Sequence, residues 1–526
     1  MVQGTSMNSD PGKKTISFGA IAAMLMLLLT LLPVLLFKYF PTVDGPAHLY
    51  NATLIRGLVS GDSDWYRQFF YFNQVPVPNW TGHFFQALTG LFLPVWIIEK
   101  FLLLIVLGML PYAVFSILKA AGIKMGWQCV MVLPFLFTVL LYLGFFNYLI
   151  GVSVMLLMLN RILYWKTPVP LSEFLWLSVG TLILYFSHLL PLILLMVFSV
   201  LIFLINRKEI VAPAKVAMQM VGLFILPIAG TIYSFRFKGI EGYQGKISRI
   251  DLTELLSWIT SGQPFIGLNG DVEGRTASLF AIMLIVAALV ALFYIVKKRM
   301  KMAGGFWLAS AIDLLVLYLV VPDGIGGGGF ISLRLLLLFF LFLVIWLLHL
   351  ELPSLLRTAL IVTSLFAAWY PSLYRIDSAK QLSADASAVI DAAEKLPPHS
   401  VLLPLNYSTH WLHINLSAYA GTRSGVVVLD NYEAKLVDFP LRWKPSAAPA
   451  LSAGNFAQSN NPEIDVDGYE KKSGIKINVV SRWSYSNQVA DTIATKTDTE
   501  IKRDFQLYDK SGNFEVFMRD GSYFSE

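Results

Sequence analysis

The sequence is nearly free of cysteine and poor in charge. Its single cysteine, Cys129, excludes an intrachain disulfide, and no Cys/His cluster indicates a structural metal site. The net charge of +6 is modest, and no basic patch with interleaved aromatics is present, so the sequence does not indicate nucleic-acid binding. Only 14% of the residues are charged, whereas 56% are hydrophobic and the mean hydropathy is +0.63. This balance is typical of an integral membrane protein.

Long apolar runs occupy most of the first 374 residues. Many reach about 18–22 residues, which as a helix rising 1.5 Å per residue is enough to cross the ~30 Å hydrocarbon core of a bilayer. The sequence therefore predicts a polytopic α-helical membrane protein with about eleven transmembrane helices. The predicted spans are 16–37, 93–118, 127–145, 148–165, 172–189, 190–206, 216–234, 277–296, 305–321, 332–350 and 355–372.

The distribution of lysine and arginine predicts the orientation of these spans. Basic residues such as Lys13, Lys14, Arg207 and Lys297 fall on one side of the membrane, which is then the cytoplasmic side. The span at 16–37 is long for a signal peptide and has no small-x-small cleavage site after it, so we expect an uncleaved signal anchor with a cytoplasmic N-terminus. An odd number of spans then places the C-terminal segment outside.

Three segments are expected on the outer side. The first outer loop, 38–92, is aromatic and amphipathic, and it predicts short helices lying at the membrane interface. The second runs over 235–276. The third, 375–526, is polar with short alternating runs, and it predicts a small mixed α/β extracytoplasmic domain after a transmembrane domain over 1–374.

Asp44 is the leading candidate for catalysis. It lies in the segment Val43–His48, just past the first span, where the chain leaves the membrane on the outer side. A carboxylate there can act as a base toward an acceptor while a lipid-linked donor keeps its tail in the bilayer. The alternative is that Asp44, followed by Gly45-Pro46, caps a helix. His48 lies four residues on, on the same face of that helix, as a substrate-binding or structural histidine.

Arg334 and His188 are candidates for binding a phosphate. Arg334 opens the tenth span after the glycine-rich segment 322–329, which lets backbone approach a ligand closely but is not a Walker loop. An arginine at the membrane edge suits a lipid phosphate, although a snorkelling interfacial arginine fits the same pattern. His188, at the outer end of the fifth span, is predicted to face the same outer cavity or to be a satisfied interfacial histidine.

Other polar residues support weaker hypotheses. Asp251 and Glu254 in the second outer loop are candidates for substrate binding, but they also fit helix-start signals. Asp62 and Asp64 are weak candidates for a metal site and also fit a solvated turn. Asp313, near the middle of the ninth span, is the residue that best fits a transporter, because a charge there must face protein or water. Two further patterns are an aromatic turn at 145–148, typical of a membrane-interface belt, and Asn-x-Ser/Thr triplets at Asn51, Asn79, Asn406 and Asn415.

The chain resembles the GT-C superfamily of integral-membrane glycosyltransferases. The resemblance rests on a first span that starts inside, an amphipathic first outer loop with Asp44 at its start, many further spans, and a soluble outer domain after the last span. As architecture it covers the whole chain, but as motif it covers only Asp44 and its surroundings. Family members often carry two adjacent acidic residues in the first loop, whereas Gly45 follows Asp44 here, so the expected divalent metal, Mg or Mn, is left in doubt.

The resemblance implies an inverting transferase that uses a polyprenyl-phosphate-linked sugar donor at the outer face of a bacterial inner membrane. Asp44 would be the catalytic carboxylate and Arg334 a contact to the donor phosphate, and the acceptor would be a lipid, glycan or protein. Two other functions fit the residues. A transporter or flippase for a lipid-linked or anionic substrate would use Asp313 and Arg334, but it should show internal repeats, which the sequence lacks. A non-catalytic membrane scaffold would tolerate neutral replacement of Asp44.

Overall fold

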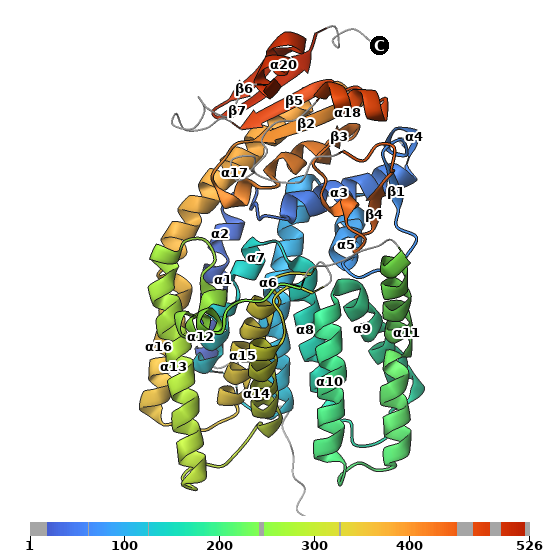
Figure 1. Cartoon of the computed structure of the whole chain (residues 1–526). Helices are drawn as coiled ribbons and strands as arrows, with labels where there is room; N and C mark the ends of the chain where they lie inside the picture. The colour runs from blue at the N-terminus through green and yellow to red at the C-terminus, as the bar shows by residue number, and fades with distance from the viewer. Residues whose placement is uncertain are drawn as a thin grey trace, which may run out of the picture.

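The computed structural model describes residues 18–60, 63–124, 126–240, 247–325, 328–449, 466–483 and 496–520. A bundle of apolar helices lies at one end of the molecule and a five-stranded sheet covers the other end (Figure 1). The helices of the first outer loop lie between the two.

Within the described ranges, five helices are long and apolar enough to cross a membrane. They are α6 (Val95–Ala120), α10 (Leu189–Asn206), α11 (Pro213–Ile240), α13 (Gly270–Val296) and α15 (Ile331–Leu348). Shorter helices lie in all but one of the remaining predicted spans, so the predicted polytopic helical fold is confirmed. These are α1 (Phe18–Thr30), α8 (Phe146–Ile162), α9 (Leu171–Ser187), α14 (Gly305–Val320) and α16 (Ser354–Trp369).

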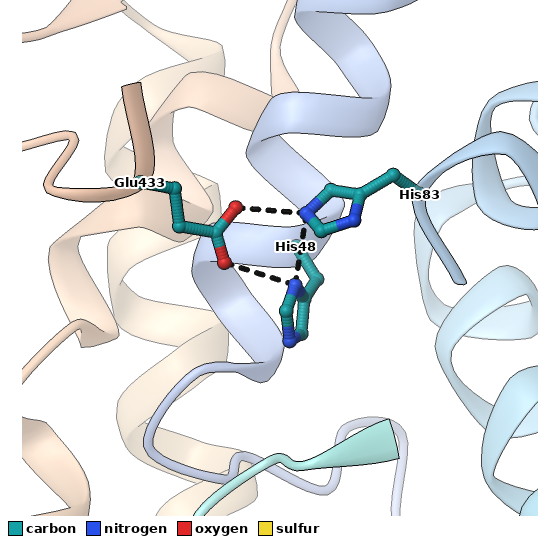
Figure 2. A group of neighbouring side chains, drawn as sticks. All are labelled: His48, His83 and Glu433. Atoms are coloured by element: carbon teal, nitrogen blue, oxygen red, sulfur yellow. Dashed lines mark hydrogen bonds and ion pairs between the residues drawn. The ribbon is translucent and has the colours of Figure 1, made fainter. Parts of the chain in front are cut away.

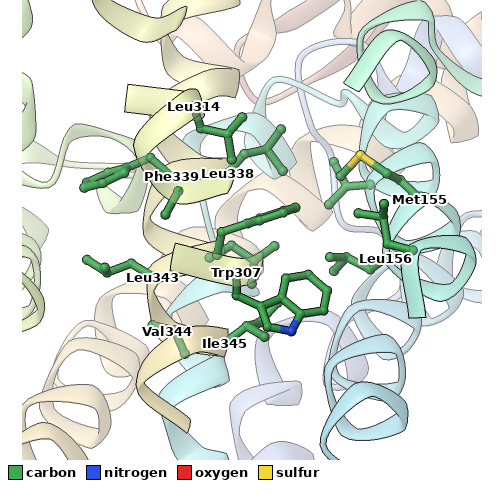
Figure 3. Close-up of a cluster of buried hydrophobic side chains, with 14 of the residues drawn as sticks. Met155, Leu156, Trp307, Leu314, Leu338, Phe339, Leu343, Val344 and Ile345 are labelled. Carbon is green, nitrogen blue, oxygen red and sulfur yellow. The ribbon is translucent and has the colours of Figure 1, made fainter. Parts of the chain in front are cut away.

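Helix α15 lies at the centre of the bundle. It is apolar all round, as expected for a helix surrounded by protein, and nearly all of its residues are buried. Figure 3 shows its Leu338 and Phe339 among side chains of other helices, including Trp307 of α14 and Met155 of α8. The bundle therefore has a core of its own, with lipid-facing side chains on the outer helices.

The predicted span at 127–145 is wrong as a single membrane-crossing helix. The segment forms a 3₁₀ helix, η1 (Trp127–Phe135), and one short turn, α7 (Val139–Tyr142). Pro134 lacks a backbone N–H, and Gly144 has φ +83°, so neither supports a continuous α-helix. Non-helical backbone is tolerated here because the segment is buried in protein. Likewise, the first span breaks after α1 into the short α2 (Leu32–Leu35), which contains Pro33.

The C-terminal segment confirms the predicted mixed α/β domain. Helix α17 (Ser372–Glu394) runs from the bundle to the sheet, whose strand order is β3-β2-β5-β7-β6. Strands β3, β2 and β5 are parallel to one another, and β7 is antiparallel to both β5 and β6. The strands are β2 (Ser400–Asn406), β3 (Val426–Val428), β5 (Val479–Trp483), β6 (Phe505–Ser511) and β7 (Phe514–Arg519), with α18 (Val466–Ser473) and α20 (Lys496–Asp504) beside them.

The first outer loop folds onto this C-terminal domain. It forms α3 (Gly45–Val59), α4 (Ser63–Tyr66), β1 (Phe70–Phe72) and α5 (Thr81–Thr89). Strand β1 pairs antiparallel with β4 (Leu441–Trp443), and one apolar core contains residues of α3 together with residues of β2 and β3.

The aromatics of this loop were predicted to lie at the membrane interface, and that prediction is wrong for Tyr66, Phe69 and Phe70. All three are buried in the core that the loop shares with the C-terminal domain. Their amphipathic spacing reflects a protein surface that the domain covers rather than a lipid surface. Helix α3, likewise, is buried along almost its whole length.

Candidate functional site

Asp44 lies where the first loop meets the turn between α7 and α8. Its backbone N–H donates to the carbonyl of Leu143, at 3.2 Å. A Cβ on Gly144, whose φ is +83°, would lie 2.9 Å from both the Cβ and the backbone N of Asp44. Asp44 occupies the N-cap position of α3, but its side chain makes no capping bond, and Thr42 Oγ1 accepts from the N–H of Gly45 instead. The expectation that the Asp44 side chain serves as the cap is therefore wrong.

The freed carboxylate of Asp44 is directed toward the C-terminal domain. Asn415 Nδ2 donates to Asp44 Oδ1 at 3.2 Å, and the hydroxyl of Tyr432 is a second hydrogen-bond partner. Burial raises the pKa of Asp44 to about 6, although His48, Tyr432 and Arg334 each oppose the rise. A carboxyl with this pKa is mostly ionised at pH 7 and still basic enough to accept a proton.

Three buried side chains from distant segments meet in one cluster (Figure 2), and two of them interact electrostatically with Asp44. His48 of α3, His83 of α5 and Glu433 of η5 (Glu433–Lys435) face one another. His48 Nδ1 lies 2.9 Å from Glu433 Oε1, His83 Nε2 lies 2.8 Å from Glu433 Oε2, and the two nitrogens are 2.9 Å apart. Burial alone would raise the pKa of Glu433, but the two imidazoles outweigh it and lower that pKa to about 2.

A pair of asparagines supports this cluster from the side. Asn51 Nδ2 donates to Glu433 Oε2 at 2.7 Å, and the Asn51 and Asn431 amides also bond to each other. Helix α3 thus supplies Asp44, His48 and Asn51 to one polar region, which the C-terminal domain completes.

Arg334 lies in the first turn of α15, with its guanidinium over two aromatic rings. Its Cζ is 4.5 Å from the ring centre of Phe145 and 5.4 Å from that of Tyr148. Arg334 Nε is buried without a hydrogen-bond partner, and the guanidinium forms no ion pair within the described residues. His188 meets the Tyr148 ring edge-on at 5.4 Å, while its Nδ1 accepts from the N–H of Leu190 at the start of α10. The structure therefore brings Arg334 and His188 together around Tyr148.

The aromatic turn at 145–148 was predicted to be a membrane-interface belt, and this prediction is wrong. Phe146 and Tyr148 are buried, and Asn147 Oδ1 accepts from the N–H of Gly82 in α5. Tyr148 also donates its hydroxyl to the carbonyl of Arg334 at 2.9 Å. These aromatics pack against site residues because the first loop and the C-terminal domain cover this end of the bundle.

Several other candidates lie apart from this region. Asp251 is the exposed N-cap of α12 (Leu252–Ser261), accepting from the N–H of Thr253 at 2.8 Å, and Glu254 is exposed in the same helix. Asp64 is fully exposed, and Asp62 lies outside the described residues. Asp313 is half-buried on α14. Of the glycosylation triplets, Asn51, Asn406 and Asn415 are buried, so their amides are not accessible in the folded protein.

Sequence reasoning missed His83, Asn415, Tyr432 and Glu433. One signal was available for the last two. The polar run 430–433 directly follows the apolar run that became β3, and the carboxyl ends of parallel strands commonly carry binding residues. Nothing in the sequence indicated that this strand end would meet helix α3.

Comparisons with known proteins support the fold. No protein-family model matches the chain, and no curated protein sequence matches it. Among solved structures, ArnT from Cupriavidus metallidurans in the apo state is similar with a TM-score of 0.52 and 12% sequence identity, over 95% of this chain and 98% of ArnT. ArnT bound to undecaprenyl phosphate matches with a TM-score of 0.49 and 11% identity, over 95% and 97% of the two chains. The chain is an integral membrane protein with the fold of ArnT, which agrees with the architecture that the resemblance implied.

Proposed function

We propose that this protein is a membrane glycosyltransferase that moves a sugar from a polyprenyl-phosphate-linked donor to a lipid, glycan or protein acceptor. The observation that carries the proposal is the Asp44 side chain. This side chain forms no helix-capping bond, is held by Asn415 and Tyr432, and has a pKa raised to about 6. Half-buried Arg334 interacts with it electrostatically and forms no ion pair within the described residues. The shared fold with ArnT supports the same class of reaction.

In this proposal Asp44 and Arg334 act on opposite ends of one displacement. Asp44 accepts the proton of the acceptor hydroxyl as its oxygen attacks the anomeric carbon of the sugar. The bond from that carbon to the phosphate oxygen breaks, and the polyprenyl phosphate leaves with the electron pair. Arg334 stabilises the negative charge on the phosphate. A single displacement of this kind inverts the anomeric configuration.

The donor tail would remain in the bilayer while its phosphate reaches Arg334. Arg334 lies at the end of α15 nearest the C-terminal domain, which suits a phosphate at the membrane surface. The exposed apolar residues Leu88 of α5 and Phe92, 63% and 81% exposed, suit contact with lipid beside the site. We place the protein in a bacterial inner membrane, with the site and the C-terminal domain on the outer face and the N-terminus in the cytoplasm.

The test compares envelope glycans and glycolipids by mass spectrometry in cells that carry wild-type protein, no protein, or one of two variants at matched membrane levels. Asp44→Asn removes the base, and Asp251→Asn changes an exposed cap as a control. We expect one sugar modification to disappear in the null strain and in Asp44→Asn and to persist in Asp251→Asn. Once the product identifies the sugar, purified Asp44→Asn should lose about 10²–10⁴-fold in kcat.

Two outcomes contradict the proposal. A modification that disappears only in the null strain makes Asp44 structural and favours a scaffold. Movement of a lipid-linked substrate across the bilayer without any glycosyl transfer favours a flippase. For the phosphate contact, Arg334→Gln should raise the KM for the donor, whereas Arg275→Gln, at an exposed position of α13, should not.

A further inference from the structure

With an ionised Glu433, hydrogens cannot satisfy all of the contacts within the His48–His83–Glu433 cluster. His48 Nε2 lies 3.1 Å from the carbonyl of Gly144, and His83 Nδ1 lies 2.9 Å from the carbonyl of Asn79. A carbonyl oxygen only accepts, so each of these outer nitrogens carries a hydrogen. In the neutral imidazoles each inner nitrogen then presents a lone pair. Both lone pairs point at the Glu433 carboxylate and at each other.

Counting hydrogens shows that no protonation state with an ionised Glu433 satisfies all of these contacts. Three short contacts join the inner nitrogens and the carboxylate, and with neutral imidazoles none has a hydrogen. One added proton leaves a nitrogen lone pair facing an oxygen lone pair. Two added protons either place two charged N–H groups 2.9 Å apart in a buried site, or place one on Glu433, whose pKa is lowered.

A single metal cation satisfies all of these lone pairs at once. We propose that His48 Nδ1, His83 Nε2 and a Glu433 carboxylate oxygen bind a zinc ion that joins the first loop to the C-terminal domain. Two imidazoles and one carboxylate are a zinc ligand set that leaves the fourth position open for water or substrate. The three side chains are 6%, 0% and 0% exposed, so the site is enclosed by protein.

The surroundings of the cluster have the features of a built metal site. Carbonyl acceptors at the outer nitrogens fix the tautomer and orientation of both rings, as is usual for metal-bound histidines, which donate their other ring N–H to an acceptor. Asn51 donates to Glu433 Oε2 and orients the carboxylate. With zinc bonds of about 2.0–2.2 Å, tetrahedral ligand atoms are about 3.3 Å apart, so the present atoms need to separate by only a few tenths of an ångström.

The ion would connect segments far apart in the chain. Two ligands come from α3 and α5 of the first loop and the third from η5, which follows strand β3. Tyr432, next to Glu433, is a hydrogen-bond partner of Asp44. The metal would therefore hold the C-terminal domain in the position in which it contacts Asp44.

The test measures metal content. Full-length protein with a histidine-free tag is purified in detergent, equilibrated with buffered zinc and analysed by mass spectrometry of the elements. We expect about one zinc per chain in wild type, and at least about tenfold less in His83→Gln and Glu433→Gln. His349→Gln, a control that changes a half-buried histidine just after α15, should keep its zinc. Zinc well below one per chain in wild type, or equal zinc in all variants, overturns the proposal.

Because a ligand variant can misfold, a second measurement uses wild type alone. Chelation should lower the thermal stability and zinc should restore it, and cobalt loaded in place of zinc should give the visible absorption of a four-coordinate site. A stripped protein with unchanged stability and no cobalt spectrum overturns the proposal. The inference does not depend on glycosyl transfer: a protein that binds zinc but transfers no sugar refutes the proposed function alone, and an active transferase without zinc refutes only the metal site.

Discussion

Gly144→Ala tests whether the backbone holds Asp44 in place. Gly144 has φ +83°, and an added Cβ would lie 2.9 Å from the Cβ and the N of Asp44 and 3.0 Å from the N of Gly45. These neighbours are backbone or next to it, so they cannot swing aside as a flexible side chain would. A left-handed φ costs alanine about 1–2 kcal/mol, and the overlap adds about 1–3 kcal/mol. We expect the free energy of unfolding to fall by about 2–5 kcal/mol.

Gly122→Ala separates the two contributions. Gly122 also has a left-handed φ, +73°, but nothing lies within 4 Å of its added Cβ, and it follows the end of α6 far from the first loop. It should lose only about 1–2 kcal/mol. Displacing Asp44 should also lower kcat in Gly144→Ala by about 10²-fold, because reacting groups tolerate little misplacement. Unfolding in detergent and turnover on the identified donor measure both effects. If the two variants match in stability and turnover, the tight placement of Asp44 is refuted.

Three further predictions concern stability. Glu273→Gln leaves Arg375, its buried partner at 2.8 Å, without a counter-charge and should cost about 3–5 kcal/mol; a Glu273→Leu/Arg375→Met double variant should recover most of it, and failure to recover contradicts this account. Burial raises the pKa of Asp430 from 3.8 to about 7, so the folded state holds its proton more tightly and stability should fall as pH rises from 4 to 7; Asp430→Asn should remove that part of the slope in thermal unfolding. Tyr50→Phe leaves the buried N–H of Val428 in β3 without its acceptor. It should lower the hydrogen-exchange protection of α3 and β3 together by about 1–3 kcal/mol. Tyr318→Phe, which removes a hydroxyl bond within the bundle, should leave that protection unchanged.

The helical part of the fold could be predicted because each span carries its own signal. An apolar run long enough to cross the bilayer specifies a helix whatever its neighbours are, and α10, α13 and α15 follow this rule. The prediction for the segment 127–145 was wrong because hydrophobicity indicates that a segment is buried, but not whether protein or lipid surrounds it. The protein interior and the lipid core are both apolar, but only surrounding protein accommodates the 3₁₀ backbone of η1.

The site could be predicted only in part, because most of it depends on contacts between distant segments. Asp44, Arg334 and His188 stood out as polar residues at the ends of apolar runs. Glu433 contacts Asn51 of α3, and Asn415 contacts Asp44, each across more than 370 residues of sequence. The local sequence around Glu433 and Asn415 specifies no such partner. The alternative of a capping role for Asp44 was reasonable locally, but Thr42 takes the nearby backbone N–H and the C-terminal domain supplies partners for the carboxylate.

The two charges of the proposed site are kept apart, and this separation leads to a last prediction. Within the described residues neither Asp44 nor Arg334 forms an ion pair, and Arg334 rests instead on Phe145 and Tyr148. A fully buried cation without a partner costs several kcal/mol, and half-buried Arg334, whose Nε is enclosed, bears part of that cost. Stacking on rings offsets only about 0.5–2 kcal/mol. The protein without ligand should thus be strained at Arg334, and an anion that pairs with the guanidinium should relieve the strain.

A polyprenyl phosphate at 100 times its Kd should therefore raise the free energy of unfolding by about 2.7 kcal/mol. Arg334→Met keeps the length and apolar packing of the side chain but removes the charge. It should make the ligand-free protein at least as stable as wild type and abolish the stabilisation by the phosphate. Thermal unfolding in detergent, with and without the phosphate lipid, measures both effects. A stabilisation that persists in Arg334→Met would mean that the phosphate binds elsewhere, and a variant less stable than wild type without ligand would mean that the buried charge is already satisfied by the protein.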